Sequence, residues 1–329
     1  MTTTETPTCS YLRQDGTRCP APVEGDGNLC FWHHPKVSKE QPGIRERLQE
    51  WAATGESMEG FVLRFANLEG VRLNSARGID LRNATLFKAR LPGASLWNVD
   101  LRGADLMKAD LSGANLNEAR LVGANILGAI LDGTKLERTD WGDRVLQEHR
   151  AIEAEHAGDH DKARENYIEA EEIYRALRRA YDGVGRFVEA GTYFQGEMRM
   201  RRKLMPRWSV GRIWSKLVDI FCGYGEEPQR VIGFSLFVVF ACAVAYFLMG
   251  VKGPEGQIGY TPGAGIPGNL LDYLNCVYYS VITFTTCGYG DIHPNPDSAT
   301  RLVASAEAFT GAFMIALFVA VFGKKMTRG

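Results

Sequence analysis

The chain has 329 residues, of which 45% are hydrophobic and 23% are charged, with a formal net charge of −1 at pH 7. This length argues against one uniform domain, and the balanced charge identifies no class of partner. Charged residues crowd positions 140 to 230, whereas the last hundred residues contain two long apolar runs. We therefore expect a multidomain protein whose first part is soluble and whose last part lies in a membrane.

The N-terminal stretch MTTTETPTCS has no basic segment followed by an apolar core, so we expect no secretory signal. The first two hundred residues should then stay in the cytoplasm. In that reducing compartment the cysteines are not expected to form disulfides.

Residues 1–40 carry the pattern C-x9-C-x10-C-x2-H at Cys9, Cys19, Cys30 and His33, with His34 as a competing fourth ligand. Three thiolates and one imidazole suit a closed tetrahedral site for Zn2+, and zinc can fold a segment that is too small for its own core. The pattern resembles the Cys3His zinc modules of some plant growth-regulating transcription factors. The zinc is expected to be structural, or at most sensory. Few basic residues accompany it, which does not favour nucleic acid as a partner.

Residues 41–60 are expected to form a linker with a short helix, and a five-residue repeat follows. From Leu81 to Trp141 a large apolar residue stands at every fifth position, with a small residue, most often alanine, two positions before it. Neither a helix nor a flat strand has this period. An eight-residue step from Leu73 to Leu81 indicates a break in the repeat.

Pentapeptides such as GADLM and SGANL resemble the pentapeptide-repeat family, whose fold is a right-handed quadrilateral β-helix with one pentapeptide per side. The resemblance implies that residues 61–141 form this β-helix, with the Leu and Ala positions pointing inward. Solenoids present extended surfaces, so the domain is expected to be either a rigid spacer or a binding site for an unknown ligand or protein.

Residues 142–206 show a helical period instead. A motif of Gly, Ala and an aromatic residue occurs at Gly158, Ala163 and Tyr167 and again at Gly185, Ala190 and Phe194. It resembles part of a tetratricopeptide repeat, although the two units lie 27 residues apart, closer than in that family. We expect an α-helical hairpin that links the β-helix to the following segment.

Seven basic residues and no acidic residue lie between Arg199 and Val218, interleaved with Trp208 and Trp214. A basic amphipathic helix with tryptophans on its apolar side should lie along an anionic bilayer surface. Residues 207–226 are therefore expected to form an interfacial slide helix that contacts anionic lipids.

Residues 227–323 contain the apolar runs, with spans expected at about 231–251 and 300–322 and a shorter stretch at about 270–284. A run of about 20 residues crosses a bilayer, whereas the shorter stretch should form a re-entrant pore helix. Basic residues precede the first span and follow the second in the tail, 324–329. Both termini are therefore expected on the cytoplasmic side of the cell (inner) membrane.

Residues 285–291 read TTCGYGD. This segment resembles the TxGYGD selectivity filter of potassium channels, and the order of span, pore helix, filter and span resembles that of the two-transmembrane class. The resemblance covers roughly residues 207–325 and implies that backbone carbonyls replace the hydration shell of K+. Gly288 and Gly290 allow the positive φ angles that such a backbone needs. One loop supplies only part of the ring, so a homotetramer is expected.

The resemblance also assigns roles to single residues. The ion-binding residues are Thr286, Cys287, Gly288, Tyr289 and Gly290, with the Thr286 hydroxyl at the innermost site. The filter is supported by Thr285, Asp291, Tyr278, Tyr279 and Glu307, with Asp291 near one of the two tyrosines. Glu307 should face protein because a charge is costly in lipid.

Gly311 is a candidate gating hinge, and close helix packing is the alternative explanation for this glycine. Cys287 stands where the family most often has Val or Ile. A smaller thiol there predicts a looser filter, with selectivity preserved or slightly relaxed, and a buried cysteine that reacts slowly.

Together these features predict a potassium-selective channel subunit that is gated or modulated through its N-terminal cytoplasmic domains. The alternatives are a weakly selective cation channel and a membrane-anchored pentapeptide-repeat platform whose pore part mainly tetramerises the solenoid. We find no pair of nucleophile and base, no phosphate loop and no open metal site, so an enzyme is not expected.

Overall fold

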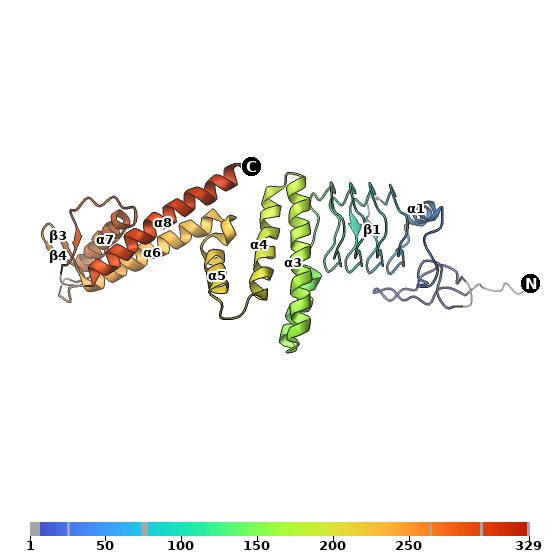
Figure 1. The fold of residues 1–329 in the computed structure, drawn as a ribbon, viewed down its shortest axis with the longest axis horizontal. Coiled ribbons are helices and arrows are strands. Elements are labelled where there is room, and N and C mark those ends of the chain that lie inside the picture. Colours follow the sequence, from blue (N-terminus) through green and yellow to red (C-terminus); the bar gives the residue numbers. More distant parts are fainter. Residues whose placement is uncertain (1–6, 25–26, 74–77, 264, 297–298, 328–329) are drawn as a thin grey trace, which may run out of the picture. The chain divides into compact units, whose positions relative to one another are not determined.

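The computed structural model of the chain describes residues 7–24, 27–73, 78–263, 265–296 and 299–327. It divides into two compact units, Met1–Arg207 and Trp208–Gly329. The first unit contains the cysteine cluster, the repeats and the helices that follow them, and the second contains the apolar helices (Figure 1). Each unit has a buried hydrophobic core of its own.

The N-terminal segment is a small irregular module followed by one helix. Isolated antiparallel bridges, such as Leu12 with Arg18 and Val23 with Cys30, fold it back on itself. Helix α1, Ile44–Thr54, then buries Ile44 and Leu48. It lies in the stretch for which the sequence predicts a short helix.

The repeats wind into stacked coils in which parallel bridges join equivalent positions (Figure 1). From Ile79 onward the bridged residues lie 20 positions apart, as in the pair of strands β1, Ile79–Asp80, and β2, Val99–Asp100. Before Arg72 the bridged residues lie 23 positions apart. Extra residues are therefore inserted between Arg72 and Ile79, where the sequence indicates a break, and residues 74–77 of that break lie outside the described part of the chain.

The period of five places the large apolar residue and the small residue before it inside the coils. Leu81, Leu101, Leu106 and Leu121 are almost fully buried, as are Ala84, Ala104 and Ala119. These two inward positions are the ones that the sequence predicts. The interior is therefore a column of stacked side chains that excludes water.

Three helices follow the repeats, where the sequence predicts a hairpin of two. They are α2, Leu146–His156, α3, His160–Gly183, and α4, Phe187–Leu204. The two repeated glycines, Gly158 and Gly185, have a φ of 77° and form the turns before α3 and α4. The additional helix α2 was not predicted because the apolar residues that it buries are both alanine, which gives a weak periodic signal.

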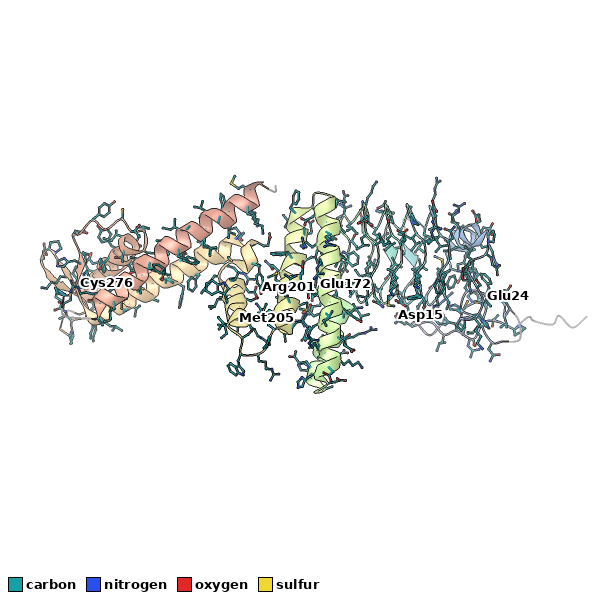
Figure 2. The ribbon with its side chains drawn as sticks, in the orientation of Figure 1. Asp15, Glu24, Glu172, Arg201, Met205 and Cys276 are labelled. Atoms are coloured by element: carbon teal, nitrogen blue, oxygen red, sulfur yellow. The ribbon has the colours of Figure 1, made fainter. Side chains whose placement is uncertain are left out.

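The second unit begins with α5, Val210–Cys222, and a short turn, Gly223–Gly225. Two helices that are long and apolar enough to cross a membrane follow, α6, Pro228–Met249, and α8, Thr300–Thr327. Helix α7, Gly265–Phe284, lies between them in the sequence and carries the buried Cys276 (Figure 2). It begins five residues before the expected start of the pore helix, because its first turn is rich in glycine and proline and was therefore not counted as part of the apolar stretch.

A small antiparallel sheet closes the loops between these helices. Strands β3, Val251–Gly253, β4, Gly256–Ile258, and β5, His293–Pro294, lie in the order β4-β3-β5. The first span was expected to continue to residue 251, but α6 ends at Met249 because Gly250 breaks the helix and Val251 pairs in the sheet.

Candidate functional site

The loop that follows α7 has an alternating backbone. Thr286, Gly288 and Gly290 have φ angles of 56°, 56° and 80°, whereas the intervening Cys287 and Tyr289 keep the ordinary negative sign. Alternation of left- and right-handed residues turns successive carbonyl groups toward one side of the chain. The backbone is therefore arranged so that a row of carbonyl oxygens can face one axis.

The positive φ angles of Gly288 and Gly290 are those predicted from the sequence. The third, at Thr286, was not predicted, because a residue with a Cβ atom adopts this conformation at a cost. Hydrogen bonds to the last turn of α7 hold the loop, from the Thr286 amide to the Thr283 carbonyl (3.0 Å) and from the Cys287 amide to the Ile282 carbonyl (2.9 Å).

All residues from 285 to 291 are exposed in the single chain. Cys287 is exposed in the single chain, and the prediction that its thiol is buried concerns the assembled pore and stays a prediction. Tyr289 is likewise exposed, at 72%. The loop extends beyond the packed helices, so any burial of these side chains has to come from other copies of the chain.

Tyr278 and Tyr279 lie on different faces of α7. The Tyr278 side chain lies close to the Asp291 carboxylate, and the sequence predicts such an arrangement for one of the two tyrosines. Tyr279 is buried and packs its ring edge against Tyr246 of α6, with ring centroids 4.8 Å apart. The two tyrosines therefore connect α7 to the loop that follows it and to the first span.

Glu307 lies on α8 and is only 2% exposed. The Tyr246 hydroxyl donates to its Oε2 at 2.6 Å, and the Ser280 hydroxyl contacts its Oε1. Ser280 Oγ also lies 2.8 Å from the Val239 carbonyl oxygen. This carboxyl group therefore joins α6, α7 and α8 inside the protein, facing protein as predicted. Tyr246 and Ser280 were missed, because a single hydroxyl in an apolar run gives no signal of its partner.

Gly311 lies where α8 crosses the end of α7. A Cβ atom at this position would lie 1.9 Å from the Phe284 carbonyl oxygen and 2.7 Å from its carbonyl carbon. Helix α8 continues without interruption through this residue. The contact fits close packing, the alternative explanation in the sequence analysis, and the role of Gly311 as a gating hinge stays a prediction.

Helix α5 is amphipathic and carries exposed apolar side chains at and near its beginning. Trp208 is 91% exposed, and Val210, Ile213 and Trp214 are exposed as well. The Ser209 hydroxyl caps the helix by accepting from the Arg212 amide at 3.2 Å. Large apolar residues exposed beside basic ones are typical of a helix that lies on a membrane surface.

The turn after α5 is tied to the end of α8. Lys324 Nζ lies 2.5 Å from Glu226 Oε1, and the two side chains are 34% and 16% exposed. Beside this ion pair, the buried Cys222 and Val321 belong to one hydrophobic cluster. A shift of α5 and its turn would therefore act on the last turns of α8.

The N-terminal unit holds a second candidate site, a cluster of three cysteines and one histidine. The ligand atoms of Cys9, Cys19, Cys30 and His33 all lie within 4.8 Å of one another, and the four residues are buried. His33 Nδ1 is 3.6 Å from Cys9 Sγ and 3.3 Å from Cys30 Sγ, and the Cys19 and Cys30 sulfurs are 3.9 Å apart. Tetrahedral Zn2+ with bonds of about 2.0 to 2.3 Å needs separations of about 3.5 to 3.8 Å. The donor set therefore fits zinc.

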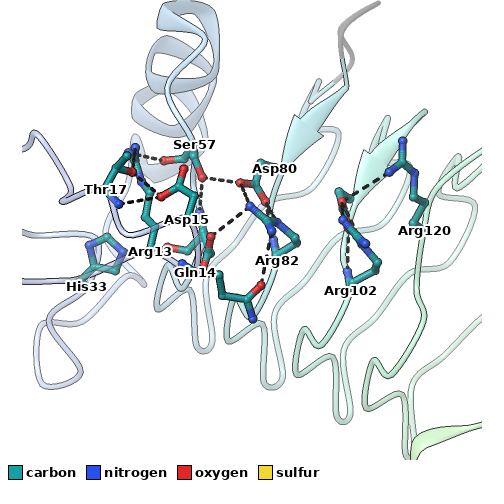
Figure 3. Close-up of polar contacts among 12 residues, drawn as sticks. Arg13, Gln14, Asp15, Thr17, His33, Ser57, Asp80, Arg82, Arg102 and Arg120 are labelled. Atoms are coloured by element: carbon teal, nitrogen blue, oxygen red, sulfur yellow. Dashed lines mark hydrogen bonds and ion pairs between the residues drawn. The ribbon is translucent and has the colours of Figure 1, made fainter.

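The hydrogen bonds of the two histidines favour His33 over His34 as the fourth ligand. His33 Nε2 donates to the Glu59 carbonyl oxygen at 2.8 Å, which leaves Nδ1 free to bind a metal. His34 Nδ1 instead accepts from the Lys36 amide at 3.2 Å. Figure 3 shows His33 beside the polar contacts that connect this module to the first coils.

Comparison with known proteins finds a family match in each of the two parts of the chain. The ion channel family matches residues 233–328, and the pentapeptide repeat family matches eight copies over residues 63–106, 79–117 and 104–140. Both families are non-enzymatic in general. The channel family covers most of α6, the whole of α7 and α8 and the alternating loop, and the repeat family covers the stacked coils.

Two rice proteins resemble part of the chain. Two pore potassium channel a of Oryza sativa subsp. japonica is 37% identical over 90 residues, which are 27% of this chain and 22% of the rice protein. Two pore potassium channel b is 31% identical over 100 residues, 30% of this chain and 25% of the rice protein. The chain thus spans about a quarter of the length of these relatives.

Among solved structures, two pentapeptide repeat proteins are similar to part of the chain. Rfr23 from the cyanobacterium Cyanothece 51142 is 30% identical, with 26% of this chain and 57% of that protein covered and a TM-score of 0.25. A protein from the Arabidopsis thaliana thylakoid lumen is 27% identical, with 30% and 74% covered and a TM-score of 0.19. From the family matches, the chain carries pentapeptide repeats followed by an ion channel domain with homologues among two-pore potassium channels.

Proposed function

We propose that the chain is a subunit of a potassium-selective channel whose pore is a homotetramer. The observation that carries this proposal is the alternation of φ at Thr286, Gly288 and Gly290, directly after α7 and inside the region that matches the ion channel family. Four such loops around one axis provide rings of carbonyl oxygens that replace the hydration shell of K+.

In this pore the residues keep the roles expected from the sequence. The carbonyls of Thr286, Cys287, Gly288, Tyr289 and Gly290 bind the ion, and the Thr286 hydroxyl completes the innermost site. Asp291 and Tyr278 hold the outer mouth, while Tyr279, Thr285 and Glu307 support the filter from behind. The buried contacts of Glu307 with two helices support this role.

For the rest of the chain we propose the domain boundaries of the sequence analysis. Residues 61–141 form a right-handed quadrilateral β-helix, which the 20-residue spacing of the bridges supports. Helices α3 and α4 form the hairpin of residues 142–206 that connects it to the slide helix, 207–226. The first unit and both termini lie in the cytoplasm and the pore in the cell (inner) membrane, with α5 on anionic lipids. The exposed Trp208 and Trp214 support that placement of α5.

The Cys3His cluster holds a structural zinc ion. When bound, zinc draws the four ligands together and supplies the folding free energy that a small module lacks. Cys9, Cys19 and Cys30 hold it through their sulfurs and His33 through Nδ1. The distances among these four atoms support this assignment.

Planar-bilayer recording of the purified protein across opposed K+ and Na+ gradients tests the channel proposal. The expected reversal potential follows the K+ gradient. One that lies between the two gradients would instead favour the weakly selective cation channel, and the small side chain of Cys287, where the family most often has Val or Ile, motivates this second candidate. Absence of K+ flux in every condition would favour the membrane-anchored binding platform.

Gating through the N-terminal domains is proposed because α4 leads into α5 through five residues, Met205 to Ser209. A shift of α4 is therefore passed to a helix that packs near the end of α8. Deletion of residues 1–140 tests this, with an altered single-channel open probability as the expected result. An unchanged open probability under all conditions would leave those domains as scaffolding.

A further inference from the structure

The candidate metal module lies directly on the first coil of the repeats. The Val62 amide of the first coil donates to the Trp32 carbonyl oxygen at 2.7 Å. The Trp32 ring stacks on Phe61, with centroids 5.1 Å apart and planes 1° apart, and the two side chains are buried. The residue next to the ligand His33 is therefore part of the core of the first coil.

A tyrosine of the module fills a gap that a glycine of the first coil leaves. Gly60 has a φ of 72°, and a Cβ atom there would lie 2.1 Å from the Tyr11 hydroxyl oxygen. The Tyr11 ring in turn stacks on the imidazole of His33, with centroids 3.8 Å apart and planes 10° apart. Tyr11 thus packs on the metal-ligating ring and on the coil at the same time.

Glu59 links the module to the coils through its backbone and through its side chain. Its carbonyl oxygen accepts from His33 Nε2 at 2.8 Å, and its buried carboxylate accepts from the Gln14 amide at 3.0 Å. The carboxylate also pairs with Arg82 at 3.2 Å, and Arg82 pairs with Asp80 at 2.9 Å (Figure 3). Asp80 belongs to β1, which pairs with β2 of the next coil.

We propose that the metal-loaded module is the N-terminal cap of the repeat solenoid, so that metal binding and folding of the first coil are one cooperative event. A solenoid exposes the apolar interior of its terminal coil unless a cap covers it. Here the cap has too small a core to fold alone and depends on its Cys3His site. The inference rests on the proposed zinc site and is independent of ion conduction.

Cooperativity of this kind is reciprocal. If zinc stabilises the first coil, a substitution that loosens the first coil weakens zinc binding by the same factor. Phe61→Leu removes the stacking partner of Trp32 and the ring that packs edge-on against His33, with centroids 5.1 Å apart, and it replaces none of the four ligands. Leu116→Val is the matched control, because Leu116 is fully buried in a later coil, where its amide donates to the Lys135 carbonyl oxygen.

The experiment uses the full-length protein in detergent. Zinc affinity is measured by competition with a chelator, and hydrogen exchange of residues 58–73 and 101–116 is followed before and after zinc removal. We expect Phe61→Leu to lower the affinity at least tenfold and Leu116→Val to lower it less than twofold. Zinc removal should speed exchange at least tenfold in residues 58–73 and leave residues 101–116 unchanged.

An unchanged affinity in Phe61→Leu, or unchanged exchange of residues 58–73 after zinc removal, would overturn the proposal. So would a well-folded protein that is purified without bound metal. Because Phe61→Leu changes one buried side chain for a smaller one, its fold is checked by exchange of residues 101–116 in the same sample. K+ flux of the unmodified protein is a separate measurement, so failure of the cap and failure of the channel are distinguishable.

Discussion

Gly311→Ala distinguishes a packing glycine from a hinge glycine in α8. The added methyl group would lie 1.9 Å from the Phe284 carbonyl oxygen, whereas ordinary contacts begin near 3.4 Å. The obstacle is backbone at the end of α7, so it cannot rotate away as a side chain could. Helix α8 and the end of α7 must separate by more than an ångström, and Phe284 is the residue directly before the filter loop.

The magnitude follows from two opposed effects. Overpacking of this kind costs about 1 to 3 kcal/mol, and replacing glycine by alanine inside a helix returns about 1 kcal/mol. We expect a net destabilisation of up to about 2 kcal/mol per chain. We also expect a lower K+ over Na+ permeability ratio, because the loop that follows α7 moves with it. Gly323→Ala is the control, since a Cβ atom at this position of the same helix meets no atom within 4 Å in the single chain.

Thermal unfolding in detergent and reversal potentials in planar bilayers measure the two expected effects. A hinge would give another pattern, because alanine would stiffen α8 without displacing α7. If Gly311→Ala kept the stability and permeability ratio of the unmodified channel and changed only its open probability, the packing argument would be refuted.

Three further predictions concern the polar contacts. Glu307→Leu leaves the buried hydroxyl of Tyr246 without its acceptor and should cost about 1 to 3 kcal/mol in thermal unfolding, more than Tyr246→Phe, which removes the donor itself. Lys324→Glu places two like charges together at Glu226 and should shift the open probability by an amount equivalent to about 0.5 to 1 kcal/mol. The double variant Lys324→Glu with Glu226→Lys exchanges the two charges and should restore the open probability of the unmodified channel. An open probability that is not restored would exclude a role for this contact. Hydrogen bonding from Tyr167, and then from Lys203, lowers the pKa of Glu155. Its stabilising effect is therefore present above the ordinary pKa of about 4.3 and is lost as the pH falls through the lowered value in the folded state. Lys203→Met should reduce this acid-dependent loss in hydrogen exchange of α2 and α3, and an unchanged pH profile would contradict the assignment.

The sequence was most informative where a local pattern decides the structure. The period of five predicted which leucines and alanines are buried, because each inward position repeats in the same place of every coil. The positive φ angles of Gly288 and Gly290 were predictable for a similar reason, since glycine adopts such angles without the steric cost that a Cβ atom brings. The four clustered donors were predictable from their types and spacing, although His33 and His34 could not be separated.

Contacts between distant segments needed the tertiary structure. Nothing near Ser280 or Tyr246 in the sequence indicates that both side chains contact Glu307. The sequence also does not tell whether a glycine within a helix allows close packing or allows the helix to bend. The choice of His33 depends on a carbonyl oxygen 26 residues later, at Glu59. Period, spacing and φ preference are local properties that a sequence records directly. The partner of a buried polar group is decided only when the chain has folded, because burial makes an unpaired group costly and so selects whichever partner lies within reach.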